Sequence, residues 1–244
     1  MKLIVANWKM NPETLGEART LASLSETGFT GLERSRIEVG ICPPFVFLPV
    51  VRHVIHFVKL GAQNLAGEEQ GPFTGEVSAP QLREFETQYV IVGHSERRGV
   101  GETNPLINKK MKIALKYKLE PILCVGYGAA KSATASRVKQ IVKAQLRSAL
   151  QGVNLQKNPI TVAYEPVWAI SKGYGKGAIV KPRQAAEIIN FITSFLRKVR
   201  VIYGGSMDAK NAAGFAGAGI AGGLVGGASL DAQDFLSIIK AFTS

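Results

Sequence analysis

The sequence predicts an α/β protein, a single-domain (β/α)8 barrel over residues 1–244 with eight parallel strands ringed by helices. Two observations predict it. Short apolar runs recur along the chain and are mostly continuous, which is typical of strands buried on both faces of a parallel sheet. Helical spacing fills the stretches between them, and each unit takes about 30 residues, the size of a βαβ repeat. Regular units without a long linker favour a closed barrel over an open, doubly wound sheet.

We expect each strand in one of these apolar runs. They are Leu3–Ala6, Ile37–Cys42, Val58–Ala62, Tyr89–Val92, Pro121–Val125, Ile160–Tyr164, Val199–Ile202 and Gly223–Val225. The clearest helix has apolar residues at steps of three and four, namely Ala185, Ile188, Ile189, Ile192, Phe195, Leu196 and Val199. Similar spacing predicts one helix through Val138–Ala149 and a last one through Phe235–Phe242.

The composition narrows the class of protein. Hydrophobic residues make up 46% and charged residues 20%, which argues against a disordered chain. The net charge of +12 favours an anionic partner, either nucleic acid, an acidic membrane or a phosphorylated small molecule. Cys42 and Cys124 both lie in apolar runs, which favours a reducing compartment over a disulfide-linked secreted protein. The N-terminal apolar run is too short for a signal peptide, and no run reaches the about 18 residues of a spanning helix.

Two titratable side chains follow predicted strands, and in such a barrel the strand ends carry the active site. Glu165 comes directly after Tyr164, where a carboxylate can act as a general base; a surface carboxylate paired with lysine is equally compatible with the sequence alone. His94 ends another strand, whereas His53 and His56 fall in a predicted helix. A helix that begins just after His94 would favour a neutral imidazole.

Polar and glycine residues follow other strands. Lys9, close to Asn7, offers a fixed positive charge, although most lysines are simply solvated. Glycine pairs occur in Tyr203-Gly-Gly-Ser206 and Leu224-Val-Gly-Gly-Ala-Ser229, after the seventh and eighth predicted strands. Main-chain N–H groups that glycine exposes at the start of a helix can hold a phosphate, and barrels of this kind commonly bind phosphate there. One glycine pair alone is first a turn signal.

The chain resembles the triosephosphate isomerase family on five blocks spread from its first strand to its last. The blocks are Asn7-Trp-Lys-Met10, Gly93-His-Ser-Glu-Arg-Arg98, Ala163-Tyr-Glu-Pro-Val-Trp-Ala-Ile170, Tyr203-Gly-Gly-Ser206 and Leu224-Val-Gly-Gly-Ala-Ser-Leu230. The resemblance implies a TIM barrel and an isomerase of glycolysis and gluconeogenesis. It would interconvert D-glyceraldehyde 3-phosphate and dihydroxyacetone phosphate through an enediolate, with no metal and no organic cofactor.

The resemblance also implies a role for each matching residue. Glu165 matches the base, His94 the neutral imidazole that polarises the carbonyl, and Lys9 the ammonium that offsets the charge of the oxyanion and of the phosphate. The remaining matches are Asn7, an orienting amide; Glu96, the carboxylate beside the lysine; Ser95, a hydroxyl near the resting base; and Ser171, Ser206, Gly226 and Gly227, the phosphate grip.

The lid that follows Glu165 departs from the family pattern. Ser171 stands where the family usually has glycine, and the segment to Pro182 is longer than usual. Tyr127 replaces a glutamate that helps to position the lid tryptophan. These differences put the closure of the lid in doubt, and not the reaction.

The segment Gln63–Ala79 is long for a loop of a compact domain and carries Phe73 and Thr74. In the family this loop inserts into a partner subunit beside its Asn7 and Lys9, which implies a homodimer. We further expect a cytoplasmic protein that binds no membrane. We expect no binding to nucleic acid, because the basic residues are scattered through the helices without an aromatic stripe. The remaining alternative is another phosphosugar-binding TIM-barrel enzyme, such as a lyase that uses a Schiff-base lysine.

Overall fold

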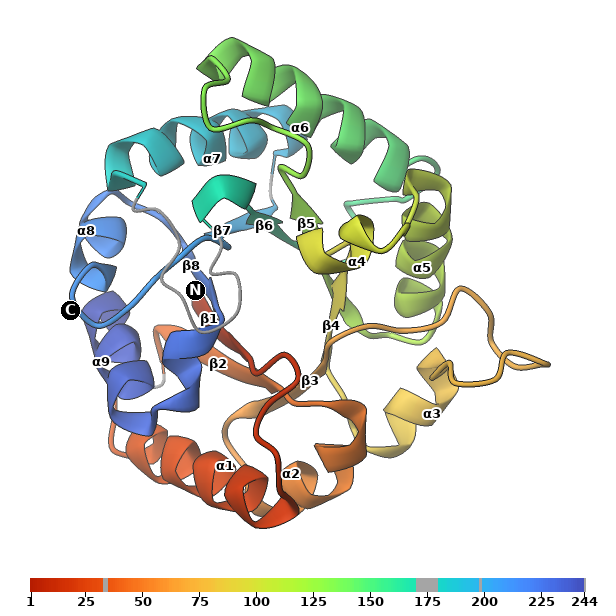
Figure 1. The fold of residues 1–244 in the computed structure, drawn as a ribbon, viewed down its shortest axis with the longest axis vertical. Coiled ribbons are helices and arrows are strands. Elements are labelled where there is room, and N and C mark those ends of the chain that lie inside the picture. The colour runs from red at the N-terminus through yellow and green to blue at the C-terminus, as the bar shows by residue number, and fades with distance from the viewer. Residues whose placement is uncertain (33–34, 170–179, 198, 244) are drawn as a thin grey trace.

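The computed structural model describes residues 1–32, 35–169, 180–197 and 199–243. In this part of the chain eight parallel strands close into a barrel in sequence order, with β8 paired to β1 (Figure 1). The strands are β1 (Lys2–Asn7), β2 (Ile37–Cys42), β3 (Lys59–Ala62), β4 (Tyr89–Val92), β5 (Glu120–Val125), β6 (Thr161–Tyr164), β7 (Arg200–Tyr203) and β8 (Gly222–Val225). The predicted fold and all eight predicted strands are confirmed, with bounds that differ by at most one residue.

The helices form a ring around the barrel in Figure 1. They are α1 (Leu15–Thr30), α2 (Leu48–Val54), α3 (Ala79–Glu84), α4 (Ser95–Gly99), α5 (Asn104–Lys116), α6 (Ala135–Ala149), α7 (Pro182–Leu196), α8 (Ala212–Gly217) and α9 (Ala232–Thr243). Short 3-10 turns add η1 (Phe45–Phe47), η2 (Val167–Ala169) and η3 (Gly227–Leu230). Several helix starts follow local chemistry, because Thr14 and Glu17 form a capping box before α1 and Pro182 occupies the first position of α7.

Apolar side chains fill two layers. The interior of the barrel holds Leu3, Val5, Cys42, Tyr89, Ile91, Ile122, Cys124, Ala163, Ile202 and Leu224. A larger cluster fills the space between strands and helices, and it includes the stripe Ala185, Ile188, Ile189 and Ile192 of α7. Strands buried on both faces explain why their sequences are continuously apolar.

The barrel closes where β8 meets β1. A Cβ atom on Gly222 would lie 1.8 Å from the carbonyl oxygen of Leu3, so this close approach requires glycine. At the N-terminal end of the barrel, where the strands begin, Arg200 pairs with Glu38 at 2.6 Å and with Glu120 at 2.7 Å. These strand-start charges therefore stabilise the N-terminal end of the barrel.

Four local expectations were wrong. His56 lies beyond α2, because the chain turns extended at Ile55. Val199 is outside α7, since Arg197 adopts a φ of 50° that ends the helix. Ala79 begins α3 and is not part of the loop. The Gly204–Gly205 pair does not begin a helix, because α8 starts only at Ala212. Among the described residues, no helix is long and apolar enough to cross a membrane.

Candidate active site

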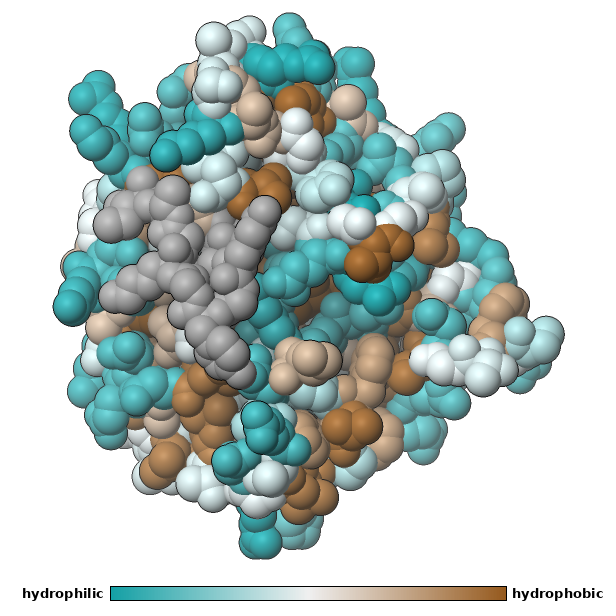
Figure 2. Space-filling view, viewed as in Figure 1, coloured by the Kyte–Doolittle hydropathy of each residue, from teal (hydrophilic) through white to brown (hydrophobic). Residues whose placement is uncertain are grey.

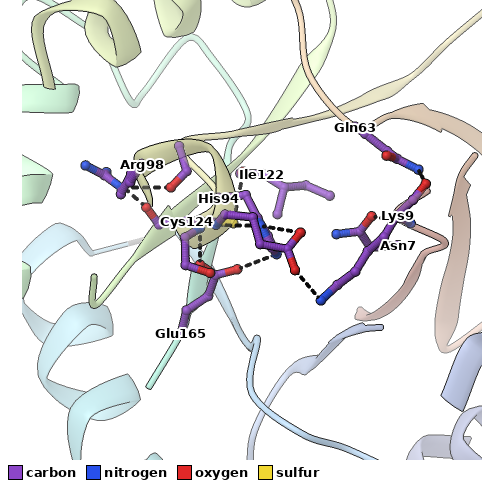
Figure 3. Close-up of polar contacts among 11 residues, drawn as sticks. Asn7, Lys9, Gln63, His94, Arg98, Ile122, Cys124 and Glu165 are labelled. Atoms are coloured by element: carbon purple, nitrogen blue, oxygen red, sulfur yellow. Dashed lines mark hydrogen bonds and ion pairs between the residues drawn. The ribbon is translucent and has the colours of Figure 1, made fainter. Parts of the chain in front are cut away.

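The predicted catalytic residues meet at the C-terminal end of the barrel (Figure 3). Asn7 ends β1, His94 follows β4 after one glycine, and Glu165 directly follows β6. The end of β5 approaches Glu165 closely: a Cβ atom on Gly126, whose φ is 119°, would lie 2.3 Å from the Glu165 carbonyl oxygen. Glycine at this position therefore lets Glu165 sit against β5, to which its N–H donates a hydrogen bond of 2.8 Å at Val125.

The Glu165 carboxylate is buried, with 1% of the residue exposed. Its Oε2 atom accepts a 2.9 Å hydrogen bond from the main-chain N–H of Ser95. Its Oε1 atom lies 3.1 Å from Nε2 of His94, yet no aligned hydrogen bond reaches it from the described residues. One carboxylate oxygen is thus held in place while the other keeps free lone pairs, which suits a general base. The Ser95 contact comes from the main chain, whereas the expectation concerned its hydroxyl.

His94 is both a helix cap and a member of the site. It occupies the N-cap position of α4, and its Nδ1 atom accepts the N–H of Glu96 at 3.2 Å. A ring nitrogen that accepts a hydrogen bond carries no proton, so this contact leaves the N–H group of the ring at Nε2. The Nε2–H group is therefore the one that faces Glu165 and the mouth of the barrel.

Lys9 contributes an ammonium group at the same end of the barrel. Its Nζ atom pairs with Glu96 at 2.6 Å, and its main-chain N–H donates to Oδ1 of Asn7 at 3.1 Å. A Cβ atom on Gly226 would lie 3.4 Å from the Lys9 Cε atom, so the loop after β8 passes directly beside this side chain. Lys9, Asn7 and Glu96 are therefore brought together as expected, with Gly226 next to them.

The other expected phosphate residues are placed around the same mouth. Gly227 is exposed at the start of η3, and Ser206 is half-buried, with its N–H donating to the Ala169 carbonyl at 2.9 Å. Ser171 and most of the lid lie outside the described residues. In Figure 2, hydrophilic residues lie at the centre of this face beside the grey atoms.

Four side chains at the site had no predicted role. Arg98 is buried and donates to the carbonyls of Gly93 at 2.8 Å and Cys124 at 3.3 Å, so it ties β4 to β5. Cys124 lies beside Glu165, and burial, followed by the charge of Glu165, raises the pKa of its thiol well above the usual value. The other two are Gln63 and Gln145, whose amides bind main-chain groups. Sequence patterns do not reveal contacts of side chains with carbonyl groups; position at a strand end was the available signal for Gln63.

No group of three His, Cys, Asp or Glu side chains that could hold a metal ion occurs within the described ranges. Both cysteines are free and buried.

Comparison with known proteins points to the same family as the five sequence blocks, over nearly the whole chain. The family model described as triosephosphate isomerase matches residues 2–242. A triosephosphate isomerase of Endomicrobium trichonymphae is 41% identical, over 98% of this chain and 97% of its own length. Those of Methylococcus capsulatus and Aquifex aeolicus are 40% and 41% identical, over 97% and 99% of this chain and 96% and 99% of their own.

Proposed function

The chain belongs to the triosephosphate isomerase family, and we propose that it interconverts D-glyceraldehyde 3-phosphate and dihydroxyacetone phosphate by proton transfer. The observation that carries the proposal is the buried Glu165 carboxylate at the barrel mouth, whose Oε1 atom has no aligned hydrogen bond from the described residues and lies 3.1 Å from the His94 Nε2 atom. The Oε1 atom of the base thus has no competing aligned donor among the described residues, and it lies next to an N–H group that can serve both substrate oxygens.

In the proposed reaction, Glu165 removes a proton from the carbon next to the carbonyl. The electrons of that C–H bond form the carbon–carbon double bond of an enediolate, and the carbonyl oxygen takes up the negative charge. The Nε2–H of His94 and the ammonium of Lys9 stabilise this charge, because both are fixed before the reaction begins. The proton on Glu165 then returns to the former carbonyl carbon. The hydroxyl on the carbon that first lost its proton becomes the new carbonyl, and its proton passes by way of the His94 imidazole to the negatively charged oxygen, which becomes the new hydroxyl.

The phosphate of the substrate is assigned to the loops after β7 and β8. Gly226 supports this assignment because it passes beside Lys9, so the phosphate and the developing oxyanion can share one ammonium. Ser206 and Gly227 complete the described part of the grip, with Ser171 from the lid and the orienting amide of Asn7.

A different phosphosugar chemistry is less compatible with the site. A Schiff-base mechanism needs a lysine nitrogen that is free to attack the substrate carbonyl, but the Nζ atom of Lys9 pairs with the Glu96 carboxylate at 2.6 Å. Lys9 therefore fits an electrostatic role, and the isomerase reaction explains the adjacent Glu165 and His94 pair.

The protein is further proposed to act as a cytoplasmic homodimer. Exposed apolar side chains follow four adjacent strands, namely Met10, Val46, Phe73 and Val100, of which Met10 is 91% exposed. The projecting loop (residues 63–78) is anchored at its base, because Glu68 binds Lys109 and Glu69 binds Lys116 of α5. Its tip protrudes from the edge of the molecule in Figures 1 and 2. An anchored loop with an exposed apolar tip suits insertion into a second copy, where Thr74 would approach Asn7 and Lys9.

The test of the proposed function is a coupled assay with D-glyceraldehyde 3-phosphate, run in both directions beside Glu165→Gln. Turnover by the wild type that Glu165→Gln abolishes is the expected result. A borohydride-trapped adduct between Lys9 and the substrate would instead support a lyase.

A further inference from the structure

Lys9 has an unusual main-chain conformation for a residue of its kind. Its φ is 55°, in the left-handed region that residues other than glycine rarely adopt. Such a conformation persists only where surrounding contacts hold it, and it is typical of functional sites. The contacts that hold Lys9 therefore decide where its ammonium points.

Two side-chain amides occupy the main-chain polar groups of Lys9. The N–H donates to Oδ1 of Asn7 at 3.1 Å, and the carbonyl accepts from Nε2 of Gln63 at 2.7 Å. Asn7 is the last residue of β1 and lies only two positions before Lys9, whereas Gln63 directly follows β3. Gln63 is thus the contact that fixes Lys9 to another part of the barrel (Figure 3).

The same amide also binds a second carbonyl. Nε2 of Gln63 donates to the Cys42 carbonyl at 2.9 Å, at the end of β2, and that carbonyl also accepts the N–H of Trp8 at 3.2 Å. Because both partners of Gln63 are carbonyl oxygens, only the NH₂ end of the amide can face them. One side chain therefore joins the ends of β1, β2 and β3 around Lys9.

Gln63 is itself held from behind. The next residue, Asn64, accepts a 2.8 Å hydrogen bond from Nζ of Lys110, and Lys110 pairs with Glu102 in the interior. Both charged side chains are almost completely buried. These buried contacts consequently fix the main chain next to Gln63, from which its amide reaches Lys9.

We propose that Gln63 is a positioning residue, which holds Lys9 in its left-handed conformation and so keeps the ammonium over the reacting oxygens. The inference rests on the proposed function. Gln63 touches no reacting atom and acts on the ammonium only through the main chain of Lys9.

A double-mutant cycle tests it. Gln63→Met removes both donors at nearly constant length, and we expect kcat/KM to fall about ten- to a hundredfold, since small misplacements of a reacting-site group have effects of that size. In a Lys9→Met background the same change should lower kcat/KM less than about threefold, because no ammonium remains to be misplaced. Dissociation constants for phosphoglycolate, which carries the phosphate and an enediolate-like carboxylate, extend the cycle to variants with little turnover.

Gln145→Met is the matched control. Gln145 also clamps main chain at the barrel rim, with Oε1 accepting the Gly126 N–H at 2.8 Å and Nε2 donating to the Tyr127 carbonyl at 2.8 Å, but it does not contact Lys9. Its effect should be the same factor with and without Lys9. Gln63→Glu, of nearly the same shape, replaces Gln63→Met if the latter does not fold. Sedimentation checks that all variants have the same oligomeric state as the wild type.

Equal effects of Gln63→Met in both backgrounds would overturn the proposal, as would a crystal structure of that variant with the Lys9 φ unchanged. A wild-type protein without isomerase activity would contradict the proposed function instead, so the two failures are distinguishable.

Discussion

The main-chain N–H of Ser95 donates a 2.9 Å hydrogen bond to Oε2 of Glu165, and the Oε1 atom has no aligned hydrogen bond from the described residues. The Glu165 carboxylate is therefore oriented by the same helix start that orients His94, because Ser95 is the first residue of α4 and His94 caps it. One helical turn thus positions both the carboxylate and the imidazole.

Shortening this carboxylate should separate chemistry from binding. In Glu165→Asp the oxygen withdraws by about one carbon–carbon bond, and we expect kcat to fall about a hundredfold or more. The dissociation constant for phosphoglycolate should change much less, because the phosphate contacts are untouched. Steady-state kinetics and calorimetry measure the two quantities. A kcat near that of the wild type would show that Glu165 is not the base.

The buried pair Glu102–Lys110 should stabilise the fold only as a pair. Lys110→Met leaves a carboxylate in the interior without its cation, and we expect the free energy of unfolding to fall by about 3–5 kcal/mol. The exposed pair Lys139–Glu187 provides the control, since Lys139→Met should lower it by about 1 kcal/mol or less. Urea denaturation measures both variants. Equal losses would contradict this assignment.

The tip of the projecting loop should govern assembly. Phe73→Asp places a charge on an apolar side chain that is 44% exposed in the single chain, so it should cost the monomer little stability. In a dimer the same charge would be buried, and we expect dissociation at micromolar concentration with reduced turnover. Sedimentation of both proteins decides the matter; a wild type that sediments as a fully active monomer would refute the dimer.

The net charge of +12 should accelerate capture of a doubly charged substrate. We expect kcat/KM to fall about threefold or more between about 10 and about 200 mM salt, because screening shortens the reach of the field. Isomerisation of glyceraldehyde without its phosphate is the control and should respond little to salt. An equal response of the two substrates would assign the basic excess to surface solvation.

Alkaline pH should destabilise the folded protein through its buried acids. Burial is the main cause that raises the pKa values of Cys42, Cys124, Tyr89, Tyr164 and Tyr203. The unfolded chain releases these protons above about pH 8.5 for the thiols and about pH 10 for the phenols, while the folded chain retains them. The free energy of unfolding should therefore fall as pH rises, by up to about 1.4 kcal/mol per pH unit for each group.

Urea midpoints between pH 7 and pH 10.5 measure this dependence, with Cys42→Ala as the control that removes one group. The slope of the variant should be smaller than that of the wild type. A flat profile, or an unchanged slope in Cys42→Ala, would contradict the expectation.

The strands were predictable because burial on both faces leaves a continuous apolar signature, as in Ile37–Cys42. The main site residues were predictable for a geometric reason, since a parallel barrel gathers all of its strand ends at one mouth, and Glu165 and His94 stand at such ends. The ends of helices were harder to predict from the sequence. No sequence signal indicates that Arg197 takes a φ of 50° and ends α7, so the apolar spacing extended the predicted helix to Val199.

The role of Gln63 was out of reach for a related reason. Its value lies in two contacts with carbonyl groups of residues 54 and 21 positions away, and every residue carries a carbonyl. The Ser95 contact with Glu165 likewise uses a main-chain N–H that any residue would supply. The sequence identifies which side chains are present, whereas these contacts depend on where the fold places main-chain N–H and carbonyl groups, which nearly all residue types share.

The pairing of β1 with β8 has a consequence for folding during synthesis. β1 leaves the ribosome before β8, which borders it on one side through pairs that run from Leu3 with Gly222 to Ala6 with Val225. One edge of β1 therefore waits, unpaired, until more than two hundred further residues have been synthesised. The nascent chain can assemble an open sheet as it emerges, but the barrel can close only after β8 has been synthesised.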